Sequence, residues 1–84
     1  MEADLRWRGS FLELKHVNGN INTFGKRVVE AMEQSNYGGL LIDISGATFT
    51  DDEAIAKAID RISWVGGQYI IIIRDETLIA YISQ

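Results

Sequence analysis

Apolar and polar positions alternate with two different periods along the chain, and the change of period separates strands from helices. Residues 5–8 and 11–17 alternate with the period of two that is typical of half-buried strands. Gly9-Ser10 stands between these segments and has the composition of a two-residue turn. The pattern predicts an amino-terminal β-hairpin.

Two segments show the period of amphipathic helices. The first covers residues 23–34, and its expected apolar stripe is Phe24, Val28, Ala31 and Met32. The second begins at Thr50, because Thr50 and Glu53 have the spacing of a capping box, and it ends at Gly66. Its expected stripe is Ile55, Ala58, Ile59 and Ile62. We also expect Glu53 and Lys57 to pair one turn apart on the outer side of this helix.

Apolar runs over residues 40–44 and 68–74 each follow a helix and a glycine pair. We interpret Gly38-Gly39 and Gly66-Gly67 as helix C-caps, and residues 40–44 as a strand covered on both faces. Helix, glycine pair and strand occur twice, which indicates two consecutive βαβ units with parallel strands and with both helices on the same face of the sheet.

The expected architecture is an α/β fold made of one domain over residues 1–84. Its four-stranded mixed sheet, in chain order, has the antiparallel amino-terminal hairpin followed by parallel strands, with helices mainly on one face. Two structures are open for residues 75–84: a short helix capped by Asp75, which we favour, or a strand over residues 77–83 that pairs with the preceding strand.

Composition narrows the class of protein. Eighty-four residues make one small domain, and the absence of cysteine excludes disulfides and thiolate chemistry. The formal net charge of −4 disfavours nucleic acid as a partner. The longest aliphatic run, residues 70–73, is too short to cross a membrane, and the acidic amino terminus is unlike a secretion signal. We therefore expect a cytoplasmic protein that does not bind membranes.

Candidate chemistry is concentrated in residues 48–53, between an apolar strand and the start of a helix, where α/β proteins often bind ligands and partners. Capping and the helix dipole explain much of this acidity, and adjacent carboxylates diverge rather than converge on a metal ion. We interpret Asp43 as structural, bound by backbone amides, and His16 as a half-buried strand residue. The sequence predicts no catalytic residue, no metal site and no cofactor.

Residues 40–51, Leu-Leu-Ile-Asp-Ile-Ser-Gly-Ala-Thr-Phe-Thr-Asp, resemble the hallmark segment of STAS domains, the sulfate-transporter and anti-sigma-factor-antagonist family. The order of the predicted elements is also similar to that family over most of the chain. The resemblance implies a regulatory domain that binds other proteins and catalyses no reaction. In the anti-sigma-factor antagonists, a partner kinase phosphorylates the serine after the motif's aspartate, and phosphorylation breaks binding.

This sequence differs from the family at the phosphorylated position. Asp51 matches the motif's aspartate, and Asp52 takes the place of the serine. Aspartate has about one negative charge where a phosphoserine has nearly two. Two hypotheses follow: the protein binds its partner constitutively, or Asp52 mimics the phosphorylated form. The expected partner-binding residues are Thr48, Thr50, Asp51, Asp52, Glu53, Ala56 and Lys57.

Several function classes are compatible with these observations. The leading one is a STAS-like regulatory module that binds a kinase-like or anti-sigma-factor-like protein, or a second copy of itself. An uncovered isoleucine face on residues 69–73 would favour a homodimer, unless the last segment covers it. The alternative is a small acidic antitoxin, immunity or adaptor protein with a basic partner. An enzyme and a binder of a small ligand, such as a lipid or nucleotide, rank lower.

Overall fold

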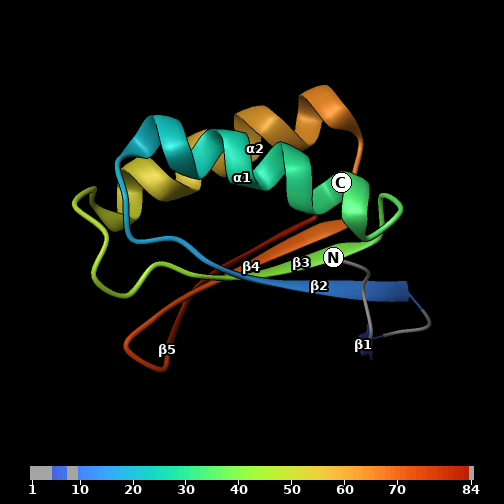
Figure 1. Cartoon of the computed structure of the whole chain (residues 1–84), viewed down its shortest axis with the longest axis horizontal. Coiled ribbons are helices and arrows are strands. Elements are labelled where there is room, and N and C mark those ends of the chain that lie inside the picture. Colours follow the sequence, from blue (N-terminus) through green and yellow to red (C-terminus); the bar gives the residue numbers. More distant parts are fainter. Residues whose placement is uncertain (1–4, 8–9, 84) are drawn as a thin grey trace.

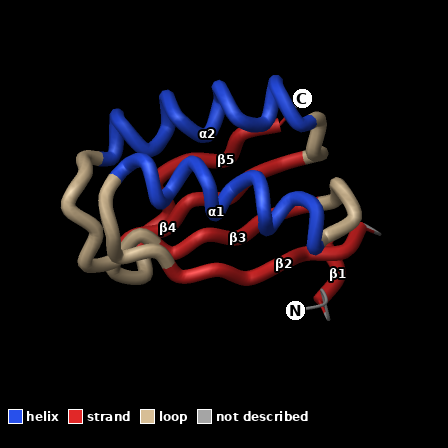
Figure 2. Tube along the Cα trace, turned by 45° about the horizontal axis from the view of Figure 1, so that its top comes forward, coloured by secondary structure: helices blue, strands red, loops and turns tan. Residues whose placement is uncertain are grey.

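The computed structural model describes residues 5–7 and 10–83, with side chains described from residue 13 onward. Two helices lie side by side on one face of a five-stranded sheet (Figures 1 and 2). The elements are β1 (Leu5–Trp7), β2 (Ser10–His16), α1 (Ile21–Gln34), β3 (Gly39–Asp43), α2 (Asp51–Val65), β4 (Tyr69–Arg74) and β5 (Thr77–Ser83). The predicted α/β class and the mixed sheet are confirmed.

The strands lie in chain order across the sheet. β2 and β3 are parallel, as are β3 and β4, and α1 and α2 cover the same face, which confirms the two βαβ units. β1 pairs antiparallel with β2, as the hairpin prediction requires. Ser10 is already part of β2 and pairs with Trp7, so it is not a turn residue. Residues 8 and 9 lie outside the described residues.

The carboxyl-terminal segment corrects the prediction that we favoured. Residues 77–83 form β5, which pairs antiparallel with β4, and the expected helix does not form. Asp75 and Glu76 adopt positive φ values of 51° and 64°, and Arg74 pairs with Thr77 on either side of them. This two-residue turn has the twist that hairpins prefer, and aspartate tolerates its left-handed backbone. β5 is therefore a fifth strand beyond β4, where we predicted a sheet of four strands.

The core lies between the helices and one face of the sheet. The predicted stripe of α1 is confirmed, since Phe24, Val28, Ala31 and Met32 have no exposed surface. The stripe of α2 is shifted: its buried residues are Ala54, Ala58 and Ile62, and Ile59 is 49% exposed. Leu40, Ile42, Ile70 and Ile72 complete the core from the sheet.

The two glycine pairs have different roles. Gly66 is the left-handed C-cap of α2 with a φ of 89°, as predicted. Ser35 is the C-cap of α1, and Asn36 and Tyr37 make the left-handed turn, so Gly38-Gly39 is not a cap. Gly39 belongs to β3, where a Cβ atom would lie 1.9 Å from the ring of Tyr69. Glycine is needed there for close packing.

No described helix covers the second face of the sheet (Figure 1). Leu41, Ile71 and Ile73 are half-buried on this face, and Leu14 and Tyr81 are each 44% exposed. The prediction that residues 40–44 form a strand covered on both faces is therefore wrong for the described residues. β5 lies at the edge of the sheet and leaves this face open. Neither helix of the described chain is long and apolar enough to cross a membrane.

Candidate functional site

The carboxyl ends of β2, β3 and β4 meet at one edge of the sheet, at the left of Figure 1. Residues 17–20, 44–50 and 75–76 connect the elements there. Residues far apart in sequence approach each other at this edge, because parallel strands all end on the same side. Most of the residues predicted to bind a partner lie here, so we consider it the candidate site.

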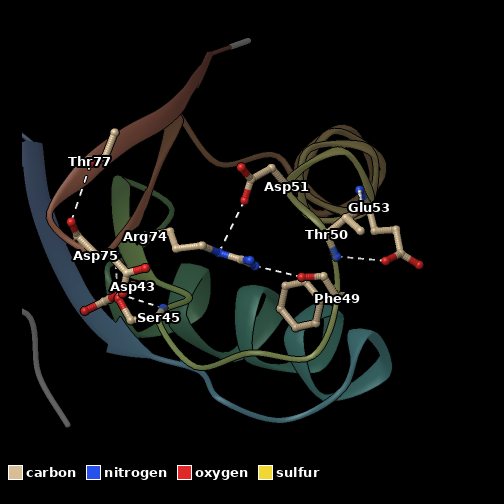
Figure 3. A network of polar contacts seen from close by, with 9 residues as sticks. All are labelled: Asp43, Ser45, Phe49, Thr50, Asp51, Glu53, Arg74, Asp75 and Thr77. Atoms are coloured by element: carbon tan, nitrogen blue, oxygen red, sulfur yellow. Dashed lines mark hydrogen bonds and ion pairs between the residues drawn. The ribbon is translucent and has the colours of Figure 1, made fainter.

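Asp43 joins β3 to the loop that follows it (Figure 3). The backbone N–H and the hydroxyl of Ser45 donate to Asp43 Oδ1 over 2.9 and 2.6 Å. The Ser45 hydroxyl oxygen in turn accepts a hydrogen bond from the backbone N–H of Asp75. These Ser45 hydrogen bonds, with a smaller contribution from His16, lower the pKa of the Asp43 carboxyl. The structural role predicted for Asp43 matches these contacts.

His16 differs from its prediction. Its side chain is 56% exposed rather than half-buried, and its Nδ1 lies 3.6 Å from Asp43 Oδ2. The two side chains border a hollow of about 360 Å³ on the open face of the sheet, next to Leu14, Leu41 and Ile73. In the described structure the Ser45 hydroxyl donates to Asp43 and not to His16. Ser45 and His16 therefore do not form the hydrogen bond by which a base activates a serine nucleophile.

Arg74, at the end of β4, holds the start of α2 in place. Its Nη2 donates to the carbonyl oxygen of Phe49 over 2.7 Å, and its Nε lies 3.3 Å from Asp51 Oδ1 (Figure 3). The Phe49 ring is buried and lies 5.1 Å from the ring of Phe24, so the loop is fixed on both sides. Sequence reasoning missed Arg74. The signal was present, because a parallel strand that ends in arginine must end beside the acidic loop of its neighbour.

The predicted capping box is confirmed. Glu53 N–H donates to the Thr50 hydroxyl oxygen over 3.1 Å, and Thr50 N–H donates to Glu53 Oε1 over 2.8 Å. Glu53 is therefore used by the cap, and the expected pair with Lys57 is not among the ion pairs of the described residues. The Thr50 hydroxyl oxygen is also used by the cap, because it accepts the hydrogen bond from the backbone N–H of Glu53.

The remaining predicted residues lie partly at the candidate site and partly further along α2. Thr48 and Asp52 are exposed at the candidate site. The Thr48 hydroxyl donates to the carbonyl oxygen of Gly19, whereas Asp52 makes no hydrogen bond or ion pair with the described residues. Ala56 is exposed one turn further along α2. Lys57 is half-buried, and its side chain passes close to Gly25 of α1, away from the candidate site.

Carboxylates predominate at this edge of the sheet. They come from β3, the first turn of α2 and the β4–β5 turn, namely Asp43, Asp51, Asp52, Glu53, Asp75 and Glu76. Within the described residues, no three acidic or histidine side chains are grouped as metal ligands. The arrangement is an acidic surface on which Asp52, Asp75 and Glu76 are exposed and their carboxylates make no ion pair with the described residues.

Comparisons with protein-family models, with curated proteins and with solved structures find no match for this chain.

Proposed function

We propose that this protein is a non-catalytic regulatory module that binds a partner protein through the β3–α2 junction. The segment that resembles STAS domains, residues 40–51, forms β3 and the loop leading into α2. In the STAS-like interpretation, a partner would contact the loop and the exposed side of the first turns of α2. Thr48, Asp52 and Ala56 are exposed along this path.

The observation that supports the proposal best is the state of Asp52. It is exposed and unpaired among the described residues, and it immediately follows Asp51, which Arg74 holds at 3.3 Å. Because the backbone of this helix end is already ordered, binding there would restrict only the side chain and not the backbone. The place of Asp52 in the resemblance is that of the phosphorylated serine. We infer that Asp52 provides a permanent charge where the related regulators have a switchable one.

Affinity purification with matched variants tests this proposal. Asp52→Asn and Asp60→Asn remove the same charge from the same helix, and the Asp60 side chain is 65% exposed but lies away from the junction. We expect Asp52→Asn to change partner affinity about tenfold, or about 1.4 kcal/mol, and Asp60→Asn to leave it nearly unchanged. Quantitative mass spectrometry identifies the retained partner, and calorimetry measures its affinity. Equal effects of the two substitutions would show that the junction is not the binding site.

Asp52→Ser tests separately whether the permanent charge of Asp52 replaces a phosphorylation switch. If Asp52 replaces a switch, the serine variant should bind differently from the wild-type protein, and incubation with a cognate kinase should restore the wild-type behaviour. If affinity is the same for both proteins, with and without that kinase, the idea of a fixed switch is wrong.

The carboxylates of the acidic edge favour a second candidate, an antitoxin, immunity or adaptor protein that binds a basic target. The identity of the purified partner distinguishes the two. A kinase-like or anti-sigma-factor-like protein would support the regulatory module, and a basic toxin or nuclease would support the alternative. Binding to a basic target should also weaken steeply as salt is raised.

A further inference from the structure

A groove lies between α1 and α2 on the side of the helices that faces away from the sheet. The helices lie side by side along most of their length (Figure 2). The groove has a volume of about 420 Å³ and is lined by Gly25, Lys26, Val29, Glu30, Arg61 and Trp64, among others. None of these residues belongs to the acidic edge described above.

Gly25 lets basic side chains of α2 come close to α1 beside this groove. Glycine inside a helix costs about 1 kcal/mol relative to alanine. Gly25 is buried in α1, and a Cβ atom there would lie 3.2 Å from both Arg61 Nε and Lys57 Cδ. The missing side chain lets these two basic residues of α2 lie against α1.

The charges around the groove are predominantly positive, although the chain as a whole has a net charge of −4. Glu30 is 3.2 Å from Arg27, and Asp60 is 3.2 Å from Arg61, so both neighbouring carboxylates have a basic partner. Lys26 and Lys57 make no ion pair with the described residues. Of the two, Lys26 lines the groove, and its charge remains available to an anionic ligand.

Trp64 forms one end of the groove. It is 73% exposed, and the Arg61 guanidinium lies 5.8 Å from the centre of its ring. Tryptophan and arginine are the residues that most often dominate protein-binding energies, because they bury a large area and keep a polar group. An exposed tryptophan beside arginine and lysine can hold an apolar side chain and carboxylates together.

We propose that this groove binds an acidic peptide segment of a partner protein, with carboxylates at Lys26 and Arg61 and an apolar side chain on Trp64. A short segment matches the local positive charge. A long polyphosphate would meet the repulsion of the acidic remainder of the molecule. The site is on a different surface from the β3–α2 junction, so this inference does not depend on the function proposed above.

Selection from a random peptide display library against the full chain tests the proposal. We expect enrichment of peptides with two or more acidic residues around an aromatic or aliphatic one. A selected peptide, synthesised and titrated by calorimetry, should lose at least tenfold in affinity with the Lys26→Gln/Arg61→Gln double variant. The loss with Trp64→Ala should be about tenfold.

Two controls locate the binding. Lys15→Gln removes the same charge from β2, outside the groove and with no ion pair to break among the described residues, and should change affinity less than threefold. Asp52→Asn should have no effect, which separates this site from the junction. Replacing the acidic residues of the selected peptide with the corresponding amides should abolish binding.

The proposal would be overturned by no enrichment, by enrichment of basic or neutral peptides, or by binding that is insensitive to the double variant. It would also be overturned if ATP or inorganic phosphate displaced the peptide at equal or lower concentration, because the groove would then be a site for small anions. A last contradicting outcome is binding of the chain to itself at the groove. It would appear as association that depends on protein concentration and is abolished by the double variant, with no peptide enriched in the selection.

Discussion

On the helix-covered face of the sheet, Ile70 and Ile72 have no exposed surface, whereas Ile71 and Ile73 of the same strand are only half-buried on the opposite face. The residues are chemically identical and alternate along one strand, so the difference comes from what lies above each face. α1 and α2 provide the apolar partners on one side. The covered face therefore accounts for most of the stability, and the open face retains apolar surface that a partner could bury.

The open face is itself divided into two parts. At one end, the Tyr69 ring packs over Gly39 and stacks on Tyr81 with ring centres 6.0 Å apart, and Tyr69 is only 4% exposed. At the other end, His16 and Asp43 border a hollow of about 360 Å³. The face is well packed at the tyrosines and hollowed near the candidate site. The two faces, and the two ends of the open face, should therefore differ in how much unfolding free energy is lost when a side chain there is changed.

The largest effect is expected from truncating isoleucines of β4 on opposite faces. Ile72→Ala leaves a cavity in the core and should lower the free energy of unfolding by about 3 to 4 kcal/mol. Ile71→Ala removes the same atoms from a half-buried site, where neighbours and solvent adjust, and should cost about 1 to 2 kcal/mol. Urea unfolding followed by circular dichroism measures both values.

Ile71→Ala also shows whether the open face is covered in solution. If both substitutions cost the same at low protein concentration, the open face is buried and the contrast between the faces does not hold. If the cost of Ile71→Ala increases with protein concentration, a second copy of the chain covers this face.

A smaller effect is expected from Gly39→Ala, which tests the packed end of the open face. The new methyl group would meet the Tyr69 ring, where a Cβ atom comes within 1.9 Å, and should destabilise the protein by about 1 to 3 kcal/mol. Combining it with Tyr69→Ala removes the obstructing ring, so the double variant should be no less stable than Tyr69→Ala alone. Additive losses in thermal or urea unfolding would show that the ring does not lie over Gly39.

The sequence was sufficient to predict elements whose signals are local. The helical stripe of Phe24, Val28, Ala31 and Met32 required only its spacing, and the Thr50–Glu53 capping box required only two residues three positions apart. The parallel pairing of β2, β3 and β4 followed from the repeated order of helix and strand. These features depend on neighbours in sequence or on general rules of chain connection.

Features that depend on distant contacts were missed. The turn at Asp75-Glu76 lacks the glycine that usually marks a tight hairpin, so the apolar residues of β5 suited a helix equally well. Arg74 acts on Phe49 and Asp51, which lie more than 20 positions away, and its role emerges only when the strands are placed side by side. The groove at Gly25 likewise depends on the approach of two helices. The residues of the candidate site were thus named from the sequence alone, and their role stays a prediction, while the residues that hold this segment in place were found from the structure.

The smallest of these effects concerns the hollowed end of the open face, where Ser45 holds Asp43. Its hydrogen bonds lower the pKa of Asp43 below the ordinary value of 3.8, so they stabilise the protein above that pH and their contribution is lost as pH falls through the lowered pKa. Ser45→Ala should therefore cost about 1 kcal/mol at pH 7, since Asp43 is partly exposed and solvent screens it. The cost should shrink at pH 3, which lies below the ordinary value of 3.8, because the carboxyl of the unfolded chain is then mostly protonated and the advantage of the ionised folded form declines. Ser63→Ala is the control, because the Ser63 hydroxyl donates to a neutral carbonyl oxygen on α2 and its effect should not change with pH. Urea unfolding of both variants at pH 7, 5 and 3 makes the measurement. If the loss of unfolding free energy caused by Ser45→Ala is the same at all three pH values, as that of Ser63→Ala should be, then Ser45 does not stabilise the ionised form of Asp43.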